Sequence, residues 1–277
     1  GIVKVRIDHP LTACLNLGAA LRDRFGLRLA GVAPSGTGLA GVARAVADMI
    51  ERELLRPEPI TLAVGTGRTL RAAVEQMGRI DCPRHRIVSL SGNIAPDGSA
   101  AYFNVLFSLS ELVTARSFPL MVPVIAANAA ERAALHRQPG NIRVMQMAAG
   151  ADTAIVGLGT FGPDAPLRKD GFLTAEEIAD RQAAGAVGEI LGHAYTVEGA
   201  FLPQDDRVAS APLPDPGRAL VAAALSRHCP ATLVVVLPHL SDVDALAEVR
   251  APLTAAVGHE LSSSLSQIPA VPAPYRG

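Results

Sequence analysis

The residues best suited to chemistry lie in the decapeptide 60–69, which reads Ile-Thr-Leu-Ala-Val-Gly-Thr-Gly-Arg-Thr. A short run of β-forming residues stops at Gly65, and an apolar-periodic helix is predicted to begin near Thr69. Glycines let backbone amides approach a ligand closely, and a helix N-terminus adds N–H donors and a partial positive charge. Thr66 can add a hydroxyl, and Arg68 a fork that suits phosphate or carboxylate. The segment therefore predicts an anion or polyol cradle, or simply a tight strand-to-helix connection.

Two other glycine motifs do not fit this chain. The decapeptide lacks the lysine and the four-residue spacer of a Walker loop. Residues 157–162 match GxGxxG after a predicted strand, but Pro163 and Pro166 follow. We expect these two prolines to prevent a helix from opening there, and a bound pyrophosphate needs that helix N-terminus. No dinucleotide or other cofactor is therefore expected.

Strand and helix patterns alternate along the chain. Strands are predicted over residues 3–7, 27–33, 60–64, 85–90, 120–127, 152–158, 193–197 and 232–237. Helices are predicted over 11–25, 39–55, 69–77 and 100–117, then after Asn128 as N-cap, and from the capping box of Thr174 and Glu177 to about Gly185. This alternation predicts an α/β fold with a doubly wound, mostly parallel sheet.

Glycine-bearing turns follow three of the predicted strands. They are Gly65-Thr66-Gly67, Ser91-Gly92-Asn93 and Gly157-Leu158-Gly159. Sheets of this kind bind ligands at the carboxyl ends of their strands. If the three strands are neighbours, the three turns converge on one crevice, which predicts a binding site there.

Composition excludes several classes of protein. A formal charge of −1 over 277 residues has no basic footprint, so the chain is not expected to bind nucleic acid by itself. The three cysteines are scattered and form no CxxC pair, so a disulfide framework is not expected. The seven histidines show no HExxH pattern, so a metal site is not expected either. No apolar run reaches the length of a membrane span. A soluble protein of the cytoplasm is the expectation.

Residues 64–70, Val-Gly-Thr-Gly-Arg-Thr-Leu, resemble the GxGxT turn of the SorC family of bacterial sugar-responsive transcriptional regulators. Six further stretches fall in matching order: 1–7, 88–93, 151–159, 171–177, 185–190 and Asp205-Asp206-Arg207. The resemblance extends over roughly residues 1–210. It implies a fold akin to ribose-5-phosphate isomerase and glucosamine-6-phosphate deaminase.

The resemblance also implies a function and a site. Residues 1–261 are expected to form an effector-binding domain, with a loose tail over 262–277. The implied partners are a sugar phosphate or polyol, the chain itself as a dimer or tetramer, and operator DNA only through an N-terminal helix-turn-helix outside this chain. No membrane partner is implied. The expected effector-binding residues are Gly65, Thr66, Gly67, Arg68, Thr69, Ser91, Gly92, Asn93, Gly157, Gly159 and Asp206.

Some of these residues have a second interpretation. Asn93 can bind sugar hydroxyls or only serve the turn that follows it. The Asp206 carboxylate can accept hydrogen bonds from two hydroxyl groups of a sugar, or it can only pair with Arg207. Asn104 is expected to be a cap or surface residue more than a ligand contact.

The sequence departs from the family pattern at two places. Some members have a lysine where this chain has Ser91, so no Schiff base with an aldehyde sugar can form there. The family's Gly-Gly pair and basic residue are missing from residues 217–245, where one alignment offers His228 and another Asp242. We therefore expect a singly phosphorylated sugar or an uncharged polyol, and not a bisphosphate.

The alternative function is a sugar-phosphate isomerase or deaminase on the same fold. Such an enzyme needs a carboxylate or histidine beside the anion-binding turn. The first cradle shows no carboxylate, and Asp97 sits on a turn that is predicted to be exposed. A sensor without catalysis is the main hypothesis.

Overall fold

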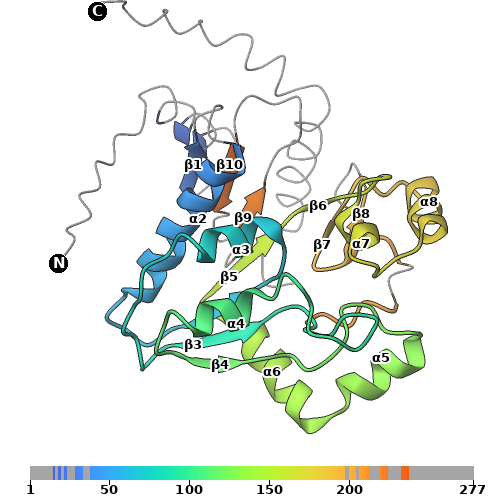
Figure 1. The fold of residues 1–277 in the computed structure, drawn as a ribbon, viewed down its shortest axis with the longest axis horizontal. Coiled ribbons are helices and arrows are strands. Elements are labelled where there is room, and N and C mark those ends of the chain that lie inside the picture. Colours follow the sequence, from blue (N-terminus) through green and yellow to red (C-terminus); the bar gives the residue numbers. More distant parts are fainter. Residues whose placement is uncertain are drawn as a thin grey trace, which may run out of the picture.

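The computed structural model describes residues 29–33, 38–196, 200–203, 206–211, 219–223 and 232–236, together with the helical positions 15, 18, 19, 22 and 23 (Figure 1). The strand predicted over 3–7, the tail 262–277, and both His228 and Asp242 lie outside these residues. Among the helices of the described residues, none has the length and apolar character that crossing a membrane requires.

The centre of the molecule is a seven-stranded sheet. Its strands, in spatial order, are β1 (Leu29–Ala33), β10 (Thr232–Val236), β9 (Ala219–Ala223), β5 (Thr153–Gly157), β2 (Thr61–Val64), β3 (Arg86–Ser89) and β4 (Arg116–Phe118). Every pair from β9 to β4 is parallel, whereas β10 runs antiparallel to both of its neighbours. The predicted mostly parallel α/β fold is confirmed.

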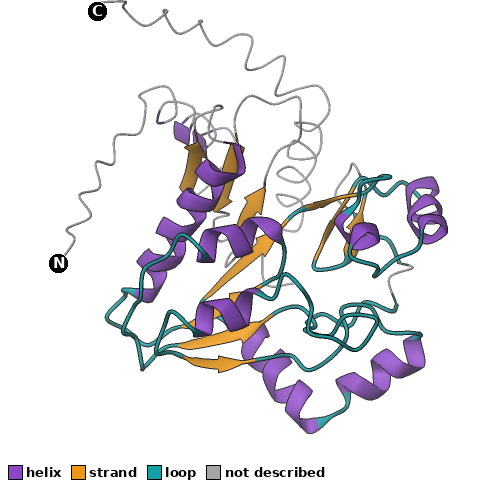
Figure 2. Cartoon of the chain, in the orientation of Figure 1, coloured by secondary structure: helices purple, strands orange, loops and turns teal. Residues whose placement is uncertain are grey.

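Helices cover both faces of this sheet (Figure 2). One face packs against α2 (Gly38–Leu54), α3 (Arg68–Val74) and α4 (Val105–Ser110), and the other against α6 (Pro139–Ala149), which follows α5 (Ala129–His136). Successive side chains of a strand point to opposite faces. Accordingly Leu62 and Val64 belong to the first hydrophobic cluster and Ala63 to the second. Burial on both faces explains why these strands are nearly all apolar.

A smaller unit follows β5 directly. It contains the antiparallel strands β6 (Gly159–Thr160), β7 (Gly188–Ile190) and β8 (His193–Tyr195), with α7 (Pro166–Lys169) and α8 (Ala175–Ala183). It has a hydrophobic cluster of its own, which includes Phe161, Leu167, Leu173, Ile178 and Ala194. Because β6 begins two residues after β5 ends, this unit lies at the carboxyl end of the main sheet (Figure 1).

Both predicted N-caps are confirmed. The Asn128 side chain accepts a hydrogen bond of 2.9 Å from the Glu131 N–H at the start of α5. Thr174 and Glu177 form the predicted capping box at the start of α8, each side chain bonding the other's backbone N–H. Caps were predictable because both partners lie within one turn of the chain.

Three local predictions were wrong. The helix expected over 100–117 is only α4, and the chain then enters β4, because this segment pairs with β3 as an edge strand. The strand expected over 120–127 is a buried loop, since Pro119 and Pro123 lack the N–H groups that a ladder requires. Two prolines did not prevent a helix after residue 162, because Pro166 occupies the first position of α7, where its missing N–H costs nothing.

The carboxylate of Glu177 makes the stability of this small unit depend on pH. It accepts a 2.7 Å bond from the Thr174 N–H and pairs with the Arg207 guanidinium. Burial raises the pKa of Glu177, but these two partners outweigh burial and hold the pKa below its usual value. A lowered pKa stabilises the fold above the unfolded-state pKa, and this contribution is lost as the pH falls through the folded-state pKa.

We expect Glu177→Gln to lower the free energy of unfolding by about 1 kcal/mol at pH 7, and this difference to shrink as the pH falls below about 4. Urea unfolding at pH 7 and pH 3 measures it. Glu176→Gln, in the same turn but exposed, is the control and should have a smaller effect at both values. An equal loss at both pH values for Glu177→Gln would contradict the prediction.

Candidate functional site

A cavity of about 880 Å³ lies at the carboxyl ends of β2, β3 and β5. Its size is within the range of small-molecule sites. Residues 66–69 line it after β2, Ser91 after β3, and residues 157–160 at the end of β5. These strands are parallel neighbours in the order β5-β2-β3. The predicted convergence of the three glycine-bearing turns is therefore confirmed.

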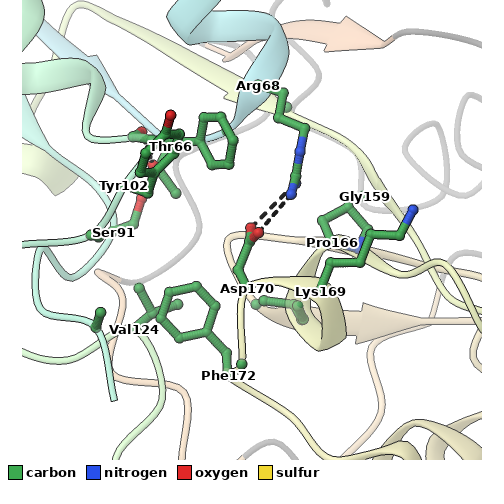
Figure 3. Close-up of a pocket in the computed structure, with 18 of the residues that line it drawn as sticks. Thr66, Arg68, Ser91, Tyr102, Val124, Gly159, Pro166, Lys169, Asp170 and Phe172 are labelled. Atoms are coloured by element: carbon green, nitrogen blue, oxygen red, sulfur yellow. Dashed lines mark hydrogen bonds and ion pairs between the residues drawn. The ribbon is translucent and has the colours of Figure 1, made fainter. Parts of the chain in front are cut away.

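Arg68 is the first residue of α3, and its side chain is held from two sides (Figure 3). Its two terminal nitrogens donate to the two carboxylate oxygens of Asp170, at 2.6 and 3.2 Å. Its guanidinium carbon also lies 4.4 Å from the centre of the Phe103 ring. The guanidinium is thus fixed before any ligand is present. Because Asp170 follows α7, this ion pair also connects the main sheet to the small unit.

This arrangement corrects one expectation. No carboxylate was predicted within the first cradle, yet Asp170 lies directly on Arg68. The two residues are 102 positions apart in the sequence, so no local pattern could have paired them.

Ser91 contributes a buried hydroxyl to the cavity. The residue is only 1% exposed, and its Oγ atom has no hydrogen-bond partner among the described residues. A buried hydroxyl without a partner costs free energy, so such groups in native proteins call for an explanation. A ligand hydroxyl in the cavity would supply the missing partner.

The turn before α3 offers backbone donors. The first N–H groups of any helix have no acceptor within the helix, and no side chain caps this end of α3. Gly67, the residue before the helix, has a φ of 127° and a ψ of 166°. Thr66 is engaged elsewhere, because its hydroxyl donates to the Phe103 carbonyl and so holds the 95–103 loop against the cradle.

Three carboxylates line the cavity in the described part of the chain, namely Asp97, Asp170 and Glu189. The Ser99 hydroxyl and N–H, at 2.6 and 3.0 Å, hold the pKa of Asp97 below its usual value. Glu189 accepts a 2.7 Å bond from the Gly192 N–H. The Asp97 turn is exposed, as expected, but it also forms part of the cavity wall.

Of the eleven predicted site residues, seven line the cavity: Thr66, Gly67, Arg68, Thr69, Ser91, Gly157 and Gly159. The other four do not: Gly65, Gly92, Asn93 and Asp206. The Gly65 N–H donates to the Ile155 carbonyl at 2.8 Å, which ties the turn to β5.

Asn93 and Asn104 form a buried pair that supports the loop. The Asn93 amide donates to the Leu120 carbonyl at 3.0 Å, and its oxygen accepts a 2.6 Å bond from Asn104. Asn104 in turn accepts from the Phe107 N–H and caps α4, as expected. Asp206 is exposed on a loop.

Sequence reasoning missed Phe103, Asp170 and Glu189. Two of them had a signal, since Glu189 lies within the family-like stretch 185–190, and Asp170 directly precedes the stretch 171–177. An acidic side chain beside such a stretch could have been marked as a candidate. Phe103 had no signal in the sequence, because its role depends on a contact with Arg68 that only the fold creates.

Comparison with known proteins agrees with this geometry. The family model described as "Putative sugar-binding domain" matches residues 9–227. The erythritol catabolism regulatory protein EryD of Brucella abortus is 34% identical over 206 residues, which cover 73% of this chain and 65% of that protein. The transcriptional regulator LsrR of Klebsiella pneumoniae is 30% identical over 209 residues, covering 72% and 61%. The chain thus spans less than two thirds of the length of either relative.

Solved structures share the fold. A DeoR family transcriptional regulator from Listeria monocytogenes matches with a TM-score of 0.66 at 20% identity, covering 76% of this chain and 86% of that one. The full-length sorbitol operon regulator SorC from Klebsiella pneumoniae matches with a TM-score of 0.64 at 20% identity, covering 76% and 69%. The family match over residues 9–227 shows that the chain belongs to the sugar-binding domain family, and the solved regulators share its fold.

Proposed function

We propose that this chain is the effector-sensing domain of a bacterial sugar-responsive transcriptional regulator. A sugar phosphate or polyol binds in the cavity at the carboxyl ends of β2, β3 and β5. Binding then changes, allosterically, how a DNA-binding part outside these 277 residues engages its operator. The observation that carries the proposal is Ser91, which lines the same cavity as the uncapped start of α3 and whose buried hydroxyl has no partner among the described residues. The chain belongs to the sugar-binding family, which agrees with such a site.

The position of the cavity supports the allosteric part of the proposal. Its wall includes the turns of the main sheet and, from the small unit, Pro166, Lys169 and Asp170. A ligand there contacts both units and competes with or reinforces the Arg68–Asp170 pair that joins them. A regulator that reads paired half-sites needs two-fold symmetry, so we also propose a dimer or tetramer.

We propose no catalysis. The relatives are named as regulators, one of them of erythritol catabolism. The carboxylates that line the described cavity wall are each held by a neighbour: Asp170 by Arg68, Asp97 by Ser99 and Glu189 by the Gly192 N–H. Carboxylates held in this way suit hydrogen bonding to a ligand better than proton transfer.

A panel of sugars, polyols and their monophosphates tests the proposal. At least one compound is expected to raise the midpoint of thermal unfolding in a saturable way. A ligand at one hundred times its dissociation constant adds about 2.7 kcal/mol, which is a shift of roughly 5 °C or more for a domain of this size.

The same samples are assayed for turnover of ribose 5-phosphate and glucosamine 6-phosphate. Stabilisation without turnover is the expected result. Turnover would support the isomerase or deaminase instead, and a panel in which no compound stabilises the chain would contradict the sensor.

A further inference from the structure

We infer that the effector of this cavity is an uncharged polyhydroxyl compound, a sugar or polyol that carries no phosphate. The inference rests on the proposed function and narrows it to one of its two ligand classes. It depends on the charges, the hydrogen-bonding groups and the apolar surface that line the cavity.

The charges of the described lining residues oppose a phosphate. Arg68 and Lys169 contribute two positive charges, and Asp97, Asp170 and Glu189 contribute three negative ones, which leaves a net charge of −1. Both cations already pair with a carboxylate. Arg68 binds Asp170 in a bidentate pair, and the Lys169 ammonium lies 3.0 Å from Asp164, with both of these side chains more than half exposed.

A phosphate would gain a cation only by displacing Asp170 from Arg68 or by drawing Lys169 from its exposed pair with Asp164. In the first case the displaced carboxylate would remain in the same cavity as an unpaired charge, which is costly when it is partly buried. The Asp170 side chain is 24% exposed. The N–H groups at the start of α3 would favour an anion, but they carry only about half an elementary charge, so they do not replace a full cation.

Hydroxyl groups match the same wall better, because a hydroxyl both donates and accepts hydrogen bonds whereas an ionised phosphate mainly accepts. An acceptor is available on the carboxylate of Asp170, whose two oxygens have lone pairs beyond those that the Arg68 guanidinium uses. Donors are available at the Ser91 hydroxyl and in the first turn of α3. A chain of neighbouring hydroxyls can satisfy both kinds of group at once.

The remaining surface suits the carbon skeleton of such a compound. Apolar and aromatic side chains complete the lining: Leu70, Tyr102, Phe103, Val124, Leu158 and Phe172. Figure 3 shows Phe172 and Val124 on one side of the Asp170 carboxylate. Small-molecule sites combine such apolar walls with a few placed polar groups.

Matched pairs of probes test the inference by isothermal titration of the 277-residue chain. The pairs are erythritol with erythritol 4-phosphate, ribitol with ribitol 5-phosphate, and sorbitol with sorbitol 6-phosphate. In the pair that binds, we expect the uncharged member to bind at least about tenfold more tightly, because it meets no charge repulsion.

Two serine variants locate the binding. Ser91→Ala should weaken the uncharged ligand about tenfold without lowering the midpoint of unfolding, because the Ser91 hydroxyl has no partner among the described residues. Ser210→Ala is the matched control, since Ser210 is also buried and its hydroxyl also has no partner within the described part of the chain, but it does not line the cavity. The dissociation constant of the uncharged ligand for Ser210→Ala should stay within about twofold of the value for the unaltered chain.

The outcomes separate the inference from the proposed function. A monophosphate that binds as tightly as its uncharged partner, or more tightly, would overturn the inference and leave the sensor intact. An uncharged ligand whose affinity Ser91→Ala does not change would overturn the assigned site. If neither the probe pairs nor the wider sugar panel bind, both the inference and the proposed function fail.

Discussion

Gly92→Ala is expected to lower the free energy of unfolding by about 3 kcal/mol, the largest loss we expect from a single added methyl group. A Cβ atom on Gly92 would overlap the backbone carbonyl groups of Val122 and Pro123. Backbone atoms cannot swing aside as a flexible side chain can, so the turn after β3 or the 122–123 segment must shift. Neighbouring Ser91 lines the cavity, so this shift should also weaken effector binding.

Urea unfolding of Gly92→Ala measures this loss. The control is Gly162→Ala, because a Cβ at Gly162 meets no atom within 4 Å and its φ is not positive. The control should change the free energy of unfolding by about 0.5 kcal/mol or less. If the two variants were equally stable, the close approach of 122–123 to this turn would be contradicted.

Gly67→Ala is expected to lower the free energy of unfolding by about 2 kcal/mol, for a different reason. It is also expected to weaken effector binding by at least about tenfold. A Cβ at Gly67 would meet nothing within 4 Å, so no clash is involved. Its φ of 127° and ψ of 166°, however, lie in a region that only glycine adopts at little cost. Relaxing to an allowed conformation would turn the backbone donors at the start of α3 away from the cavity.

Two measurements check this prediction, namely urea unfolding and titration with the ligand that the sugar panel identifies. Gly78→Ala serves as the control, since Gly78 follows α3 with open space at its Cβ position and no positive φ. Unchanged affinity in Gly67→Ala would show that the amides after residue 67 do not hold the effector. Unchanged stability would show that the backbone there relaxes freely.

Gly67 and Gly92 are required for different physical reasons, and their two turns contribute to the cavity in different ways. At Gly92 the neighbouring backbone leaves no volume for a side chain, and at Gly67 the backbone angles exclude one. Both turns were predicted as binding turns from their glycines, their polar side chains and their position after predicted strands. Only the structure shows that the first positions Ser91 from outside the cavity, whereas the second is part of its wall.

Much of the architecture was predictable from the sequence because its signals are local. The apolar runs of β2, β3 and β5, the caps at Asn128 and Thr174, and the glycines after the strands each involve residues within a few positions of one another. Local signals also failed where a partner far along the chain decided the outcome. The segment 116–118 became a strand because β3 offered it an edge, although it had been predicted as helix.

By itself, the sequence determined the fold class and the three turns that meet at the strand ends, since periodicity and turn chemistry depend on short segments. The family was indicated separately, by the resemblance of stretches such as residues 64–70 to known regulators. The tertiary structure alone decided the electrostatics of the site. It placed Asp170 on Arg68 across 102 residues, packed Phe103 against the same guanidinium, and buried the Ser91 hydroxyl with no partner among the residues that the structure describes. Such contacts depend on how the small unit packs on the main sheet, and no short segment of sequence contains that information.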